Sequence, residues 1–240
     1  MEIKNLYKSF TEATLLGSKL LAILIDPDKF EITNAATFLR DLPSDTSHIF
    51  VGGSTVSSGA TELVVNNIKL YTSRPVLIFP GDFNQITDAA DGLLFLSLLS
   101  GRNPEYLIGQ QVKAVAHLRL SALEIIATGY ILIDGGRESA VARVTATSPM
   151  SQQNVQHIVD TAKAGVLMGA KLIYLEAGSG AIVPVSTTII TEVKKEIDVP
   201  LIVGGGIRSE EQKQMAYHAG ANMVVMGTVF ENSKNRPQQI

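Results

Sequence analysis

Short apolar runs recur along the chain, and polar or glycine-rich segments separate them. Each run is about as long as a buried strand. The apolarity within a run is continuous rather than alternating, which is typical of strands buried on both faces, as in a parallel sheet. The eight predicted strands are Leu21–Asp26, His48–Gly53, Val76–Gly81, Gly92–Leu99, Gly129–Asp134, Lys171–Ala177, Leu201–Gly205 and Met223–Gly227.

Helical spacing between most of these runs supplies the second half of the pattern. Ser186–Ile197 and Ser209–Ala219 are examples, and the second opens with Ser209 and Gln212, a capping-box pattern. Eight strands with helical returns fill 240 residues, which predicts one TIM (β/α)8 barrel domain over residues 1–240. A doubly wound open sheet is the alternative. We favour the barrel because no shift in composition marks a second domain.

Two connections depart from the regular βα unit. The third, Asp82–Asp91, is too short for a stable helix, so we expect a thin or open outer wall beside the third and fourth strands. The fifth begins with Gly135–Gln153, which is rich in Gly, Ser, Thr and Arg and lacks helical periodicity. A long irregular stretch after a barrel strand is a candidate lid.

Composition narrows the class of protein. The chain has 20 basic and 23 acidic side chains and a net charge of −3, which argues against a nucleic-acid scaffold. It has no cysteine, which excludes disulfides, cysteine-bound zinc, iron–sulfur clusters and thiol nucleophiles. Met1–Phe10 lacks the apolar core of a signal peptide, and the longest apolar run, Leu93–Leu99, is too short to span a bilayer. We expect a cytoplasmic protein with at most peripheral membrane contact.

The strand ends of a TIM barrel carry its chemistry, and the last two predicted strands end in glycine. Gly205 and Gly206 precede a capped helix, and Gly227 is followed by Thr228. Such ends expose backbone N–H groups, and the loops after strands seven and eight are the usual phosphate site of this fold. The alternative is that these glycines only make tight turns.

Glu176 lies in an otherwise apolar strand, where a carboxylate is costly unless it has a partner or a task. It is a candidate general base at the barrel mouth. The alternative is a structural ion pair, with Lys171 or with an arginine from a loop.

Asp26 closes a wholly apolar strand and precedes Pro27. It could ligate Mg²⁺, which prefers hard oxygen donors, or cap the following turn. Ser54 adds a hydroxyl at the neighbouring strand end and favours the metal site, whereas Asp28 fits either a supporting group or a turn. The histidines do not cluster with carboxylates and are interpreted as surface or satisfied core residues: His48, His117, His157 and His218.

Four segments together resemble the geranylgeranylglyceryl phosphate synthase family, over essentially the whole chain. They are Ile25–Lys29, Val51–Ser54, Tyr174–Gly180 and Val203–Arg208. The Tyr-Leu-Glu-x-Gly-Ser-Gly segment is specific to that family, whereas the Gly-Gly-Gly-Ile stretch is shared with many phosphate-binding barrels. The resemblance is closer to the archaeal and Bacteroidetes-type branch than to the heptaprenyl-using branch of Firmicutes. In that second branch a lysine often stands two positions before the first aspartate, where this chain has Leu24.

The resemblance implies a Mg²⁺-dependent prenyltransferase. It would join the 3-hydroxyl of sn-glycerol 1-phosphate to an allylic prenyl diphosphate, such as geranylgeranyl diphosphate, and would form a homo-oligomer. Asp26 and Ser54 would hold Mg²⁺, and Glu176 would take the hydroxyl proton, with Tyr174 beside it. The residues implied to hold glycerol phosphate are Tyr174, Leu175, Glu176, Ala177, Gly178, Ser179, Gly180, Gly205, Gly206, Gly227 and Thr228.

A long prenyl tail needs an apolar groove, and the short third connection could leave one. Its candidate lining residues are Phe79, Phe95, Leu96 and Leu99, although ordinary core positions are the alternative. Two other functions are considered. One is a sugar-phosphate isomerase or cyclase of the histidine-biosynthesis type, with Asp26 and Asp134 as its carboxylates, but the third strand lacks the second phosphate loop such an enzyme needs. The other is a barrel that binds a phosphorylated ligand without catalysis.

Overall fold

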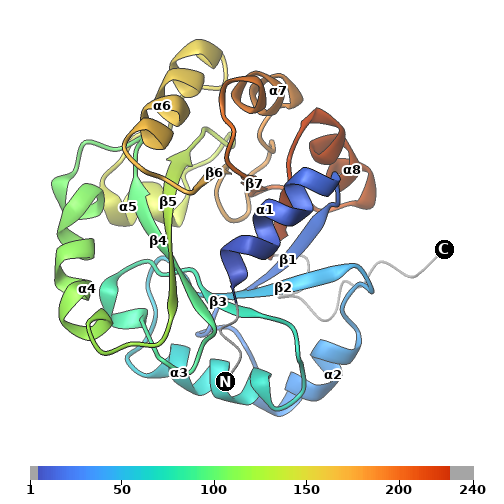
Figure 1. Ribbon diagram of the computed structural model, residues 1–240, viewed down its shortest axis with the longest axis vertical. Helices are drawn as coiled ribbons and strands as arrows, with labels where there is room; N and C mark the ends of the chain where they lie inside the picture. The colour runs from blue at the N-terminus through green and yellow to red at the C-terminus, as the bar shows by residue number, and fades with distance from the viewer. Residues whose placement is uncertain (1–4, 228–240) are drawn as a thin grey trace.

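Eight parallel strands close into a barrel in the computed structural model, which describes residues 5–227 (Figure 1). Each strand pairs with its neighbours in chain order, and β8 pairs with β1. The predicted barrel is confirmed and the open sheet is wrong. All eight apolar runs are strands, although β5 begins at Glu124 rather than at Gly129. The strands are β1 (Leu20–Ile25), β2 (Thr46–Val51), β3 (Val76–Ile78), β4 (Gly92–Leu98), β5 (Glu124–Leu132), β6 (Leu172–Glu176), β7 (Leu201–Gly204) and β8 (Met223–Met226).

Helices surround the barrel, and their apolar faces pack on the outward side chains of the strands (Figure 1). Among residues 5–227, no helix combines the length and the apolarity needed to cross a bilayer. The surrounding helices are α2 (Ala35–Arg40), α3 (Ala60–Lys69), α4 (Gln110–Leu118), α6 (Val155–Leu167), α7 (Thr187–Glu196) and α8 (Glu210–Ala219).

Alternation along β6 decides which of its side chains face the barrel interior. Ile173 and Leu175 belong to the outer apolar cluster, between strands and helices. Leu172 and Tyr174 belong to the inner cluster, which fills the barrel. Since side chains two apart in a strand share a face, Glu176 continues the inward series at the carboxyl end of the strand.

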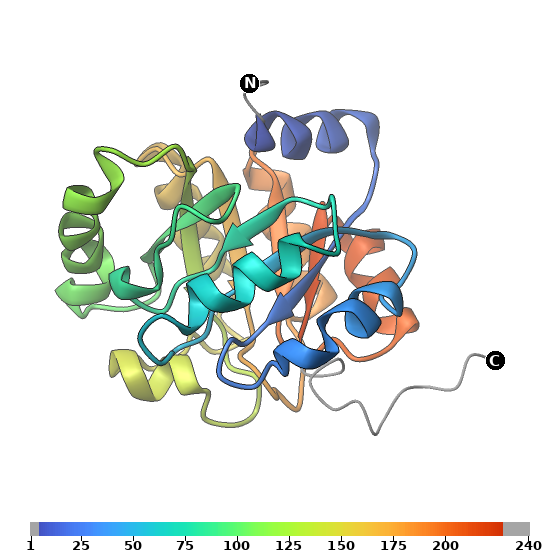
Figure 2. The same cartoon turned by 90° about the horizontal axis from the view of Figure 1, so that it is seen from below.

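A helix that the sequence analysis did not predict, α1 (Leu6–Leu16), lies across the amino-terminal end of the barrel (Figure 2). Leu6 and Phe10 pack into the inner apolar cluster. The Glu124 carboxylate accepts the backbone N–H groups of Leu6 and Tyr7, the second at 2.9 Å, where it also favours the helix dipole. Helix α1 therefore covers the end of the barrel opposite the carboxyl ends of the strands.

The third connection is short, as predicted, and contains only the single turn η2 (Phe83–Gln85). The fourth passes through η3 (Glu105–Gly109) into α4. The fifth contains a six-residue helix, α5 (Ala140–Thr145), so the prediction of an irregular segment is wrong there. Ser139 caps α5 by accepting the Ala142 N–H at 3.1 Å. A helix this short shows no periodicity in the sequence, and its cap and tertiary contacts stabilise it.

Candidate active site

A cavity of about 490 Å³ opens at the carboxyl ends of the strands. Asp26 and Ser54 line one side of it, and Glu176, Gly205 and Gly206 line another. The residues predicted to hold a metal and those predicted to hold a phosphate thus share one cavity.

Glycines make room for the Glu176 carboxylate on the neighbouring strand end. Glu176 is 6% exposed, and its Oε1 accepts the Gly178 N–H at 2.7 Å. A Cβ atom on Gly204 would lie 2.8 Å from Oε2, and one on Gly205 would lie 2.3 Å from Oε1. Any side chain at these two positions would displace the carboxylate. Gly204 and Gly205 therefore do more than make a tight turn.

Burial raises the pKa of Glu176 to about 7. The Gly178 N–H and the nearby Tyr174 hydroxyl oppose this rise, because both favour the ionised form. A carboxylate with a pKa near neutrality can accept a proton during turnover. The alternative ion pair with Lys171 is wrong, since the Lys171 ammonium lies 5.4 Å from the centre of the Tyr7 ring, on α1.

Tyr174 lies below Glu176 and is fully buried. Its ring stacks on Phe79, with centroids 5.1 Å apart, and meets Tyr130 edge-on at 5.4 Å. Burial and the Glu176 charge hold the Tyr174 pKa well above its usual range, so its hydroxyl stays protonated. That hydroxyl lies beside the Glu176 carboxylate and favours its ionised form.

The glycine-rich loops after β6 and β7, where a phosphate site is predicted, both line the cavity. Gly205 and Gly206 both have left-handed backbones, with φ of +80° and +73°. Arg208 donates to the Ala181 carbonyl and ties the two loops together. The other predicted residues that line the cavity here are Ser179, Gly180 and Gly227.

The helix that follows these loops is capped almost as predicted. Ser209 Oγ accepts the Gln212 N–H at 3.2 Å, which confirms the N-cap. Gln212 reaches back to the N–H of Arg208, at 2.7 Å, rather than to that of Ser209. The cap fixes the backbone just after the two glycines, so the N-terminus of α8 lies soon after them in the chain.

Three residues that were predicted to bind the substrate do not line the cavity: Leu175, Ala177 and Gly178. Leu175 and Ala177 point into the outer apolar cluster, away from the cavity, because alternation along β6 directs them there. The Gly178 N–H is already taken by Glu176. Thr228 lies outside the described residues.

Asp26 has the turn-capping role, one of the two that the sequence left open. Its Oδ1 accepts the Asp28 N–H at 3.2 Å, so it caps the turn, and its Oδ2 pairs with the Lys29 ammonium at 2.8 Å. It also lines the cavity together with Ser54. Asp28 does not line the cavity; its carboxylate accepts the Ser57 N–H at 3.1 Å and so links the turn after β1 to the loop after β2.

The donor set at this side of the cavity suits Mg²⁺ only in part. Within residues 5–227 no three His, Asp or Glu side chains are grouped as metal ligands. Asp26 and Ser54 supply a carboxylate and a hydroxyl, both hard oxygen donors. Mg²⁺ often binds one or two carboxylates and takes its remaining ligands from water and substrate phosphates, so the residues fit a metal that arrives with a phosphorylated substrate.

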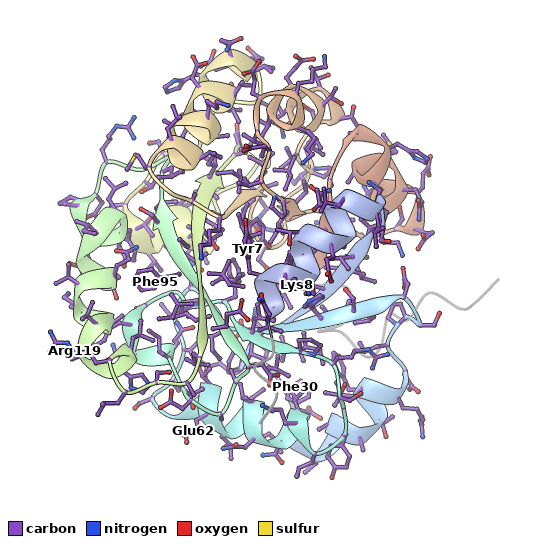
Figure 3. The ribbon with its side chains drawn as sticks, viewed as in Figure 1. Tyr7, Lys8, Phe30, Glu62, Phe95 and Arg119 are labelled. Atoms are coloured by element: carbon purple, nitrogen blue, oxygen red, sulfur yellow. The ribbon has the colours of Figure 1, made fainter. Side chains whose placement is uncertain are left out.

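An apolar extension of the cavity runs over β4. Because η2 replaces a full helix, Leu93 and Phe95 on the outer face of β4 line the cavity, as does Leu96 on the inner face. Phe95 lies on the side of β4 that faces α4 (Figure 3). Leu99 does not line the cavity, since its Cδ1 lies only 2.4 Å from where a Cβ on Gly165 would be, against α6.

Several cavity residues were missed by the sequence analysis. Helix α5 contributes Val141 and Val144, so the predicted lid segment does border the cavity. Tyr106 of η3 and Gln111 of α4 contribute another wall. These residues belong to helices and turns rather than to strand ends, and nothing in their spacing distinguishes them from ordinary surface or core positions.

The positions of Asp134 and His48 decide two further expectations from the sequence. Asp134 is exposed, lies outside this cavity, and accepts the Gly136 N–H at 2.9 Å as a turn residue. The pair of carboxylates required for the isomerase alternative is thus not assembled. His48 is buried, but its Nε2 has no partner within the described residues, so it is a core histidine that is not fully satisfied.

Known proteins resemble this chain along most of its length. Residues 14–240 match the PcrB family. The geranylgeranylglyceryl phosphate synthase of Zunongwangia profunda is 55% identical over 93% of this chain and 95% of its own, and that of Pyrococcus furiosus is 41% identical over 90% and 86%. The structure of (S)-3-O-geranylgeranylglyceryl phosphate synthase from Thermoplasma acidophilum, in complex with its substrate sn-glycerol-1-phosphate, superposes with a TM-score of 0.87 at 33% identity, covering 95% of this chain and 92% of that one.

Proposed function

Because the chain belongs to the PcrB family, we propose that it is a prenyltransferase that makes geranylgeranylglyceryl phosphate. It joins the 3-hydroxyl of sn-glycerol 1-phosphate to C1 of an allylic prenyl diphosphate, with geranylgeranyl diphosphate as the expected donor. The observation that carries this proposal is the position of Glu176, in one cavity with two glycine loops and with Asp26 and Ser54.

The glycine loops bind the phosphate of glycerol 1-phosphate. Gly205 and Gly206 present backbone N–H groups without side chains in the way, and α8 begins soon after them. A phosphate held there directs the glycerol chain toward Glu176, whose carboxylate contacts the backbone beside Gly205. The Tyr174 hydroxyl, which lies beside that carboxylate, would orient the glycerol hydroxyls.

The transfer is a substitution at the allylic carbon. The bond between the glycerol 3-oxygen and prenyl C1 forms, and the bond from C1 to the diphosphate oxygen breaks. The electron pair of that broken bond leaves with diphosphate, and the hydroxyl proton passes to Glu176. A base within hydrogen-bond reach of the alcohol contributes roughly 10² to 10⁴ in rate.

The leaving group needs its charge neutralised. Asp26 and Ser54 would hold Mg²⁺, which when bound offsets the negative charge that develops on diphosphate. Lys29, which lines the same side of the cavity, adds a second cation there. Asp26 already orders the turn that carries Lys29, so the carboxylate and the ammonium are presented together.

The prenyl tail occupies the apolar extension over β4. Burying hydrocarbon there stabilises the bound donor by roughly 0.8 kcal/mol per CH₂. The truncated third connection is what opens this side of the barrel, and α4 covers it from outside. Phe79, stacked on Tyr174, stands where the apolar extension meets the reacting end.

The proposal is tested by incubating the purified protein with Mg²⁺, ¹⁴C-labelled sn-glycerol 1-phosphate and prenyl diphosphates of several lengths. The expected result is an ether product that resists mild acid, which destroys allylic diphosphates, with geranylgeranyl diphosphate as the best donor. A folded protein that forms no ether product with any donor contradicts the proposal. Product with sn-glycerol 3-phosphate but not with the 1-phosphate contradicts the acceptor.

A further inference from the structure

Gln85 is buried and touches the loop that carries Ser54, although it contacts neither predicted metal ligand. It is 3% exposed and belongs to η2, the single turn that replaces the third helix. Its Nε2 donates to the Gly53 carbonyl at 2.8 Å, and its Oε1 accepts the Gly53 N–H at 3.3 Å. One side chain therefore satisfies both polar groups of a single residue, as a neighbouring strand would.

The loop after β2 is packed directly against the loop after β3. A Cβ atom on Gly52 would lie 1.8 Å from the Phe79 carbonyl oxygen, and one on Gly81 would lie 2.3 Å from the Gly53 oxygen. The two backbones touch because neither glycine has a side chain. The segment that leads from β3 into η2 is therefore in direct backbone contact with Gly53, the neighbour of Ser54 in the chain.

Gly53 also lies against Asp26. A Cβ on Gly53 would be 3.3 Å from Asp26 Oδ1. The turn that holds Gln85 is itself fixed from two sides: Asp82 accepts the Asn84 N–H at 2.8 Å, and Gln110 of α4 accepts the Phe83 N–H at 2.9 Å. A continuous series of contacts therefore runs from α4 through Gln85 and Gly53 to Asp26.

We propose that Gln85 is a positioning residue for the leaving-group end of the site. By binding both polar groups of Gly53, it holds the Ser54 hydroxyl and the Asp26 carboxylate at the separation needed to share one divalent cation with a prenyl diphosphate. This inference rests on the proposed function. It also accounts for the shortened third connection, since a full helix would remove the turn that aims Gln85 at Gly53.

The test uses Gln85→Glu, which is nearly isosteric but cannot donate to the Gly53 carbonyl. Gln85→Met, which removes both hydrogen bonds at similar length, is measured in parallel. Gln153→Glu is the matched control, because it makes the same change on an exposed side chain. Circular dichroism and thermal unfolding establish that each variant is folded.

Metal binding is measured apart from turnover, by electron paramagnetic resonance of Mn²⁺ titrated into each protein with geranylgeranyl diphosphate present. We expect Mn²⁺ affinity to fall about 10- to 100-fold in both Gln85 variants. Calorimetry should show the affinity for sn-glycerol 1-phosphate within about twofold of wild type, since the glycine loops after β6 and β7 are untouched. The control should match wild type in both measurements.

Two results would overturn the role of Gln85. One is a folded Gln85 variant that binds Mn²⁺ as tightly as wild type. The other is an equal loss of glycerol phosphate affinity, which indicates a general structural role. The proposed function can fail separately from the role of Gln85. In that case the wild type makes no ether product but still binds Mn²⁺ together with the diphosphate, and the Gln85 variants weaken that binding. The positioning role then stands without the transferase activity.

Discussion

The raised pKa of Glu176 makes a prediction about stability as well as about catalysis. The perturbation is Glu176→Gln, which keeps the shape of the side chain and removes its charge. In the wild type, Glu176 Oε1 accepts the Gly178 N–H at 2.7 Å, and the side-chain carbonyl oxygen of glutamine can accept the same N–H. The substitution therefore changes chiefly the cost of burying a negative charge.

The magnitude follows from the two pKa values. Burial raises the pKa of Glu176 from 4.5 to about 7, and each pKa unit corresponds to about 1.4 kcal/mol. Because the folded protein binds this proton more tightly than the unfolded chain does, the free energy of unfolding of the wild type falls as pH rises from about 4.5 to about 7. Above that range the loss is complete, at roughly 3 kcal/mol. The glutamine variant has no such loss.

The assay is urea unfolding of wild type and variant, without substrates, at intervals from pH 4.5 to pH 8. We expect Glu176→Gln to gain about 3 kcal/mol relative to wild type between the two ends of this range. Titrations elsewhere in the protein cancel in the comparison. Glu62→Gln, on the exposed surface of α3, is the control and should stay within about 0.5 kcal/mol of wild type throughout. Figure 3 shows Glu62 on the outer side of the molecule.

The same variant should lose turnover by roughly 10² to 10⁴ while it keeps its affinity for glycerol phosphate. Wild-type turnover should rise with pH up to about 7, since only the ionised carboxylate accepts a proton. A stability difference between variant and wild type that is the same at pH 4.5 and pH 8 refutes the pKa reasoning. Turnover of the variant equal to that of wild type dismisses Glu176 as the base.

Three further substitutions test other parts of the structure. Asp26→Asn should raise the Mg²⁺ concentration for half-maximal activity by about tenfold or more; a Mg²⁺ titration identical to wild type rules Asp26 out as a ligand. Gly205→Ala should weaken glycerol phosphate binding by more than about tenfold and destabilise the fold, because φ at Gly205 is +80° and the new methyl meets the Glu176 carboxylate. Calorimetry measures the binding and urea unfolding measures the stability. A wild-type value in either measurement contradicts the packing described around Glu176. His48→Gln concerns acid stability: burial lowers the pKa of His48 to about 4, so wild-type stability should fall by up to about 3 kcal/mol as pH drops from about 6.5 towards 4. The variant should lack this fall, and urea unfolding that shows the same decline in both proteins contradicts it.

Some predictions from the sequence stay predictions. These are the homo-oligomeric state, the cytoplasmic location, the Mg²⁺ requirement and the single domain over residues 1–240. The length of prenyl chain that the protein accepts also awaits the product assay, because it depends on where the apolar extension over β4 ends.

The sequence alone determined the barrel and indicated most of the candidate site residues. Continuous apolar runs such as Leu201–Gly205 specify strands buried on both faces, and this information is local. Glycines and a carboxylate at strand ends are conspicuous because they interrupt those runs, which is why Glu176 and Asp26 could be recognised. The fold then requires these ends to meet, since all strands of a parallel barrel finish at one rim.

Only the tertiary structure decided the parts that depend on contacts between distant segments. Helix α1 is fixed by Glu124, more than a hundred residues away, and Gln85 binds Gly53 across 32 positions. Side chains in short turns such as η2 show no periodicity, and a buried glutamine has no pattern that separates it from a surface one. The direction of Leu99 and the pKa of Glu176 likewise follow from what surrounds each group after folding, because burial arises only when separate segments are packed together.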